Sequence, residues 1–151
     1  MVGWGDIRDE LEAATEGRPI LFTGPMEHRH LAHLLALADV AVTPSTFPEA
    51  FGMVAAEAAA CGVPPLVARH SGLAEIAEGL EAEYPPKLRH LASFENENVE
   101  ELAAKMNEIL QLPAAEKTTL REAARRAAVD RWSWEGIATV ILTSQWETSS
   151  A

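Results

Sequence analysis

The chain has 151 residues, of which 48% are hydrophobic and 23% charged, as expected for one globular domain with a core. Its net charge of −11 argues against a general nucleic-acid or anionic-membrane surface, because either partner requires a basic face. The single cysteine, Cys61, excludes an internal disulfide framework and suits a reducing compartment. No apolar run approaches the roughly 20 residues of a membrane span, so we expect a cytoplasmic protein.

Short apolar runs alternate with helical patterns along most of the chain. Apolar periodicity, glycines and prolines predict helices over residues 6–15, 28–38, 53–61, 73–78, 99–110, 114–130 and 134–146. Buried strands are predicted over residues 20–23, 40–43 and 66–68, with residues 88–92 as a candidate last strand. Strands that alternate with helices at this spacing indicate parallel βαβ units. The predicted fold class is therefore α/β, with a Rossmann-like parallel sheet flanked by helices.

The predicted sheet has fewer strands than the five or six of a usual doubly wound domain. We therefore expect that the chain starts partway into a larger fold. Residues 1–146 are predicted to form a truncated ligand-binding domain, and residues 147–151 a disordered tail.

Two glutamates stand out in the segment Pro-Glu-Ala-Phe-Gly-Met-Val-Ala-Ala-Glu. Glu49 and Glu57 lie eight positions apart across a Phe-Gly pair, and Glu57 is the only charged residue between Met53 and Cys61. Because burying an unpaired carboxylate is costly, Glu57 must face water or meet a hydrogen-bond donor. A ligand rich in hydroxyl groups supplies such donors.

The glutamate segment begins at the end of a predicted strand, where ligands bind in open α/β sheets. Residues 23–26, 43–45 and 68–72 follow the carboxyl ends of the predicted strands. Gly52 allows a ligand to approach the backbone, and the N–H groups of Gly52, Met53 and Val54 begin a helix, which suits a phosphate or diphosphate. Since carboxylates bind hydroxyls, the inferred ligand carries phosphate between hydroxyl-bearing groups, as a nucleotide sugar does.

Residues 44–64 resemble the Glu-x7-Glu signature of retaining glycosyltransferases of the GT-B fold, closest to family 4. Three flanking features are also similar to that family: Phe22-Thr23-Gly24 with Leu34-Leu35 and Ala38-Asp39-Val40, Ser71-Gly72-Leu73-Ala74-Glu75-Ile76, and Trp132-Ser133-Trp134. The resemblance runs from about Gly3 to Gln145. It implies part of a GT-B C-terminal domain, which binds the donor.

The resemblance also implies a role for each matching residue. Glu49, the catalytic position, would bind donor-sugar hydroxyls and help to position the anomeric carbon. The backbone of Phe51, Gly52, Met53 and Val54 would hold the sugar and distal phosphate, Glu57 the ribose hydroxyls, and Met26 and Glu27 the nucleobase. Similar enzymes use no metal and no cofactor, and the nucleotide diphosphate sugar is a substrate.

Several departures from the family pattern limit what this chain is expected to do. Ser71 stands where glycine is more usual, Val63-Pro64-Pro65 replaces a single proline, and residues 78–90 lack the usual Gly-Leu-Leu-Val-x-Pro pattern. The Arg and Lys that contact the diphosphate, and the N-terminal acceptor domain, have no counterpart here. The full enzyme would transfer a hexose to an acceptor, whereas this chain alone is expected to be inactive.

Other interpretations remain open. The chain could be a non-catalytic α/β module that binds a nucleotide or a protein partner, and an uncovered sheet edge could drive self-association. A nucleotide-sugar epimerase of similar shape is a further alternative. His28, His30 and His33 are interpreted as a solvated helix start rather than a metal site, and Trp132 and Trp134 as core residues.

Overall fold

The computed structural model describes residues 1–3 and 5–147. The chain divides into two compact units, one up to Leu34 and one from Leu35 onward. Among the described residues, no helix combines the length and the apolar character that a membrane span requires. Helix α2 (His28–Ala36) contains the boundary between the units, close to the predicted helix over residues 28–38.

The first unit contains helix α1 (Arg8–Ala14), inside the predicted range 6–15. The prediction of a strand over residues 20–23 is wrong: these residues have no assigned strand structure, and Leu21 is 72% exposed. Thr23 donates a backbone hydrogen bond to Met1 at 3.0 Å, and the Arg8 guanidinium donates to the Phe22 carbonyl at 3.1 Å. Residues 20–23 therefore bond to other residues of the first unit and do not form part of a sheet.

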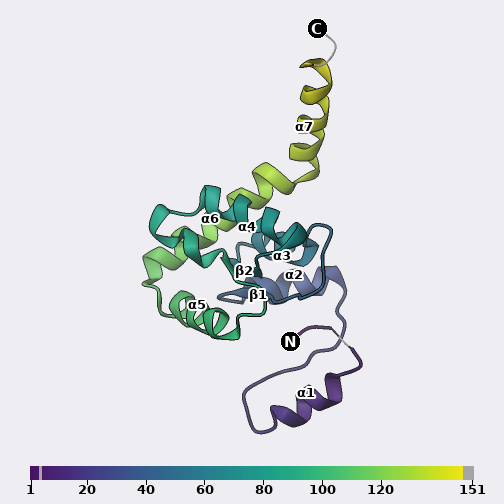
Figure 1. Cartoon of the computed structure of the whole chain (residues 1–151), viewed down its shortest axis with the longest axis vertical. Coiled ribbons are helices and arrows are strands. Elements are labelled where there is room, and N and C mark those ends of the chain that lie inside the picture. Colours follow the sequence, from purple (N-terminus) through teal and green to yellow (C-terminus); the bar gives the residue numbers. More distant parts are fainter. Residues whose placement is uncertain (4, 148–151) are drawn as a thin grey trace. The chain divides into compact units, whose positions relative to one another are not determined.

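The second unit is built on a parallel sheet with the order β1-β2-β3. Figure 1 labels β1 and β2. Its strands are β1 (Ala41–Thr43), β2 (Pro65–Ala68) and β3 (Ser93–Phe94), with Val42 opposite Leu66 and Ala68 opposite Phe94. The predicted strands over residues 40–43 and 66–68 and the Rossmann-like α/β class are confirmed.

The candidate strand over residues 88–92 is wrong. Residues Pro86–Leu91 form the 3-10 helix η1, and β3 begins only at Ser93. Leu88 and Leu91 are both buried, and a 3-10 helix places side chains three positions apart on the same face. The apolar residues of this segment therefore belong to a short helix and not to a strand.

Helices pack around the sheet in the second unit. They are α3 (Met53–Ala60), α4 (Ser71–Glu83), α5 (Val99–Gln111) and α6 (Ala114–Trp132), and α6 is followed by α7 (Trp134–Glu147), which packs against α6. The first of these fits its predicted range, and α4 is longer than the predicted 73–78. Because α7 includes residue 147, only residues 148–151 of the expected tail remain, and these lie outside the described residues.

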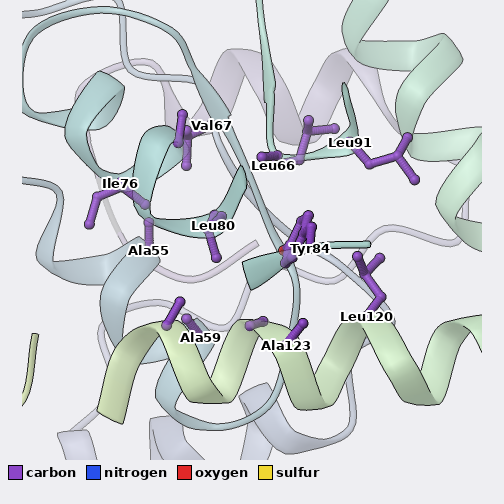
Figure 2. Close-up of a cluster of buried hydrophobic side chains, with 14 of the residues drawn as sticks. Ala55, Ala59, Leu66, Val67, Ile76, Leu80, Tyr84, Leu91, Leu120 and Ala123 are labelled. Atoms are coloured by element: carbon purple, nitrogen blue, oxygen red, sulfur yellow. The ribbon is translucent and has the colours of Figure 1, made fainter. Parts of the chain in front are cut away.

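Small side chains let α6 pack closely against α3 and α4. Ala59 of α3 and Ala123 of α6 are fully buried, and Figure 2 shows them with Leu80, Tyr84 and Leu120 in the core cluster. Trp132 packs against this cluster, as predicted. Trp134 does not: it is 85% exposed at the start of α7, so its expected role as a core residue is wrong.

Candidate functional site

Two loops meet at the carboxyl edge of the sheet. Residues 44–52 connect β1 to α3, and residues 69–70 connect β2 to α4. Since β1 and β2 are adjacent and parallel, both loops leave the sheet at the same edge. Glu49, Phe51 and Gly52 all lie on the first loop, and Met53 begins α3. The structure thus brings most of the predicted site residues to the edge where α/β folds bind ligands.

Gly52 is the residue before α3, and both its conformation and its surroundings require glycine. Its φ of 104° is in the left-handed region, which side chains rarely adopt. A Cβ at this position would lie 2.6 Å from Cδ2 of Leu73. The first N–H of α3 that bonds back is that of Ala55, to the Gly52 carbonyl at 3.0 Å. The earlier N–H groups of the helix have no intrahelical acceptor, so they suit an anion.

The Glu49 backbone is held from the neighbouring connection. The Ser71 hydroxyl accepts a hydrogen bond from the Glu49 N–H at 3.0 Å, and the Gly72 N–H donates to the Glu49 carbonyl at 2.9 Å. A Cβ on Gly72 would lie 2.4 Å from the backbone nitrogen of Phe51, so only glycine permits this approach. The Glu49 side chain itself is half-buried.

Glu57 lines a pocket of about 220 Å³ between α3 and the end of α6. The pocket is mainly apolar, and its lining residues are Phe51, Met53, Ala56, Glu57, Ala60, Ala128, Val129, Trp132 and Ser133. The rings of Phe51 and Trp132 meet edge to face, with centroids 6.1 Å apart and planes at 78°. Met53 is 60% exposed and Val54 57%, so the first two residues of α3 face solvent, whereas Ala55 is buried.

The two basic side chains after β2 are engaged with protein groups. Arg69 forms an ion pair with Glu81 and donates a hydrogen bond to the Ser93 hydroxyl at 3.1 Å. The hydrogen bond to Glu81 raises the pKa of Arg69. His70 bonds the Ser45 carbonyl and the Ser71 hydroxyl. Arg69 therefore links the end of β2 to α4 and β3, and His70 links it to the loop after β1.

Met26 and Glu27, the predicted nucleobase contacts, belong to the first unit. Met26 is half-buried, and Glu27 is exposed and forms an ion pair with Arg29 at 2.7 Å. Their role in a shared site stays a prediction. Within the described part of the chain, no group of three or more His, Cys, Asp or Glu side chains is placed to share a metal ion.

Sequence reasoning missed the contacts that link distant segments of the site. The hydrogen bonds from residues 70–72 to residues 45–49 join positions more than 20 apart in sequence. The α6 residues that line the Glu57 pocket are separated from it by an even longer stretch of sequence. The Ser71-Gly72 pair after a strand was the available sign of the first link, whereas no local pattern indicated the second.

The fold and this edge define a Rossmann-like α/β protein with a helix N-terminus and Glu49 at the carboxyl edge of its sheet, where folds of this class bind ligands. Residues 2–128 match the family described as Glycosyl transferases group 1, and the chain belongs to that family.

The chain is similar to several proteins of known class. It is 48% identical, over 77 residues, to a GDP-mannose-dependent alpha-(1-6)-phosphatidylinositol dimannoside mannosyltransferase of Mycobacterium tuberculosis; the match covers 50% of this chain and 20% of that protein. It is 35% identical to the glycogen synthase of the same species, over 81% of this chain and 27% of that protein. Sucrose-phosphate synthase from Thermosynechococcus elongatus has a similar structure, with a TM-score of 0.69 and 26% identity over 99% of this chain and 38% of that one.

These matches confirm the expected resemblance to GT-B glycosyltransferases. The chain spans well under half of the length of each of these relatives. The activity of a whole enzyme is therefore a matter of proposal for this chain.

Proposed function

We propose that this chain is the donor-binding part of a retaining, family 4-like glycosyltransferase that transfers a hexose from a nucleotide diphosphate sugar. The observation that carries the proposal is the edge built around Gly52. There the N-terminus of α3 begins four positions after Glu49, and Glu57 lies one turn further along α3. Membership of the glycosyltransferase family supports the same assignment.

In this proposal the N-terminus of α3 receives the diphosphate. Backbone N–H groups and the helix dipole favour negative charge there, by roughly 0.3–1 kcal/mol and up to about 2 kcal/mol when desolvated. The backbone of Phe51, Gly52, Met53 and Val54 holds the sugar and the distal phosphate. No metal and no cofactor is needed to neutralise the diphosphate, because this helix end does so together with basic side chains from outside this chain.

Carboxylates take the two hydroxyl-bearing ends of the donor. Glu49 accepts hydrogen bonds from the sugar hydroxyls and positions the anomeric carbon, and Glu57 accepts them from the ribose. The position of Glu57 in a pocket lined mainly by apolar groups supports this role, since hydrogen bonds to a partly desolvated carboxylate are strong. Met26 and Glu27 contact the nucleobase.

The Arg and Lys contacts to the diphosphate belong to an upstream strand and loop, and the acceptor contacts to an N-terminal domain, and both lie outside this chain. Residues 1–146 form one donor-binding domain. On its own this chain binds the donor weakly and does not catalyse transfer. It takes no nucleic acid as partner, in keeping with its net charge of −11. A cytoplasmic location fits the single cysteine.

Replacement of Glu57 tests the proposal. Titration calorimetry with UDP, GDP and ADP compares the native chain with Glu57→Ala and with Glu122→Ala, a control at an exposed glutamate of α6. A hydrogen bond to a charged group contributes about 1.5–3 kcal/mol, so Glu57→Ala should weaken nucleotide binding by about tenfold or more. Affinity that is unchanged in Glu57→Ala would count against the assignment.

An interaction role is the second candidate. Trp134, Ile141 and Leu142 of α7 are 85%, 54% and 66% exposed, and large exposed apolar side chains favour association. Size-exclusion chromatography with light scattering tests self-association: a mass that rises with concentration supports it, and a constant monomer mass argues against it.

A further inference from the structure

A hydrogen-bonded chain links His70 and Ser71 to the loop that carries Glu49. The Nε2 atom of His70 lies 2.5 Å from the Ser45 carbonyl oxygen, and its Nδ1 atom lies 3.0 Å from the Ser71 hydroxyl oxygen. That hydroxyl oxygen lies in turn 3.0 Å from the Glu49 backbone nitrogen. The two ends of the chain are thus attached to the same loop, at residues 45 and 49.

The chemistry of the groups determines the direction of two of these bonds, and the neutral form of the ring determines the third. A carbonyl oxygen only accepts, so Nε2 of His70 carries a proton and donates to Ser45. In the neutral ring Nδ1 is then an acceptor, and the Ser71 hydroxyl donates to it. The Ser71 oxygen keeps lone pairs to accept from the Glu49 N–H. One neutral tautomer of His70 therefore satisfies all of these contacts.

Ser71 adopts a backbone conformation that usually belongs to glycine. Its φ is 46°, in the left-handed region, where a residue with a side chain is uncommon. Glycine would adopt this conformation without strain, but it has no hydroxyl to bond Glu49 and His70. The serine thus accepts an unfavourable backbone conformation and gains two hydrogen bonds that glycine lacks.

Both polar groups of the Glu49 backbone are held by this connection. The N–H donates to the Ser71 hydroxyl, and the carbonyl accepts from the Gly72 N–H at 2.9 Å. The Glu49 backbone is therefore located by residues more than 20 positions later in the chain. Its side chain remains half-buried at the edge of the sheet.

We propose that His70 and Ser71 are positioning residues that fix the Glu49 backbone and thereby direct its carboxylate toward the hydroxyls of the donor sugar. The proposal rests on the proposed donor function, in which Glu49 contacts the sugar and not the nucleotide. His70 and Ser71 are therefore expected to affect binding of the sugar part of the donor and not binding of the nucleotide part.

The hydrogen-bonded chain is tested without any ligand, by NMR of the full chain at mildly alkaline pH. The ring nitrogens of His70 should show the neutral form with its proton on Nε2, and the Glu49 amide should exchange slowly with solvent. Ser71→Ala should shift the Nδ1 resonance and accelerate exchange of that amide. His90→Gln, which removes an exposed ion pair with Glu108, should do neither. A proton on Nδ1, or exchange at Glu49 that Ser71→Ala leaves unchanged, would overturn the proposal.

Ser71→Gly separates the hydroxyl from the backbone conformation. This variant relieves the left-handed strain and removes the hydroxyl, whereas Ser71→Ala keeps the strain and removes the hydroxyl. Faster exchange of the Glu49 amide in both variants shows that the hydroxyl holds the loop. Faster exchange in Ser71→Ala alone shows that strain is responsible, and contradicts the proposal.

Ligand titrations test the effect on the sugar. Calorimetry with the pairs GDP and GDP-mannose, and UDP and UDP-glucose, measures what the sugar adds to the affinity of each nucleotide. In Ser71→Ala and Ser71→Gly the affinity gained from the sugar should fall by about tenfold, the effect of one hydrogen bond to a charged group, while affinity for GDP and UDP stays within about twofold. Equal losses for nucleotide and nucleotide sugar would show a general structural effect and refute the positioning role. If the native chain binds none of the four probes, the proposed function fails for this chain, and the ring-nitrogen and exchange measurements still decide whether the pair fixes Glu49.

Discussion

Gly52→Ala should destabilise the second unit more than an ordinary glycine replacement. At Gly52 an alanine must take a φ of 104°, which costs a residue with a side chain about 1–2 kcal/mol. Its Cβ would also lie 2.6 Å from Cδ2 of Leu73, well inside van der Waals contact. Leu73 is fully buried and cannot move into solvent, so the overpacking costs a further 1–3 kcal/mol, about the range seen in other cores.

Together these effects predict a loss of about 2–5 kcal/mol from the free energy of unfolding, a large part of the roughly 5–15 kcal/mol of a typical domain. Urea unfolding followed by circular dichroism measures it. Gly62→Ala is the matched control, because Gly62 also has a positive φ, 71°, but the nearest atom to a new Cβ is the Arg121 carbonyl oxygen at 3.9 Å. Equal losses in the two variants would refute the steric argument at Gly52.

Three further predictions concern single contacts outside the ligand edge. The buried Tyr84 hydroxyl has no hydrogen-bond partner among the described residues, and an unpartnered buried polar group costs about 1–3 kcal/mol. Tyr84→Phe should therefore leave the midpoint of urea unfolding unchanged or raise it, and a clearly lower midpoint would contradict this. Asn98 is the N-cap of α5, and its side chain accepts a hydrogen bond from the Glu101 N–H at 3.0 Å. Asn98→Ala should lower the free energy of unfolding by about 1 kcal/mol in the same assay, and an unchanged free energy would argue against the cap. The hydrogen bond to Lys105 lowers the pKa of Glu101 from its ordinary 4.5. The stabilisation from this bond is therefore complete above pH 4.5 and is lost as the pH falls through the pKa of the folded state. NMR titration of the Glu101 carboxylate should show a higher pKa in Lys105→Gln, and an unchanged pKa would refute the assigned cause.

Local pattern was sufficient to predict the segment that carries the candidate site. The helix after Gly52 ends with Gly62 and then Pro64, an order typical of helix ends, and the structure places α3 at Met53–Ala60. The strands on either side, β1 and β2, were also predictable because each is a short apolar run bounded by turn residues. The parallel order of the sheet follows from the alternation of strands and helices.

Burial and distant contacts explain what the sequence could not predict. Residues 20–23 have the same apolar character as β1, yet Leu21 is largely exposed, because a strand also requires a partner that the local sequence does not specify. Leu88 and Leu91 fit a strand or a 3-10 helix equally well by composition. Trp134 was predicted to be buried like Trp132, but only Trp132 reaches the core.

For the site, residue types identified Glu49 and Glu57 but not the groups that hold them. The contact between Gly72 and the backbone of Phe51 depends on how two loops leave adjacent strands. The positive φ of Ser71 gives a physical reason why glycine suits that position, and no sequence pattern showed that its hydroxyl bonds Glu49.

The central claim, that the start of α3 holds a nucleotide sugar donor, is tested most directly by NMR chemical-shift titration of the chain with UDP, GDP and ADP. The account predicts that amide shifts cluster at Gly52, Met53, Val54 and Glu57, with Met26 also affected, and that one base produces larger shifts than the others. Shifts confined to other residues, with residues 52–57 unmoved at millimolar ligand, would contradict it.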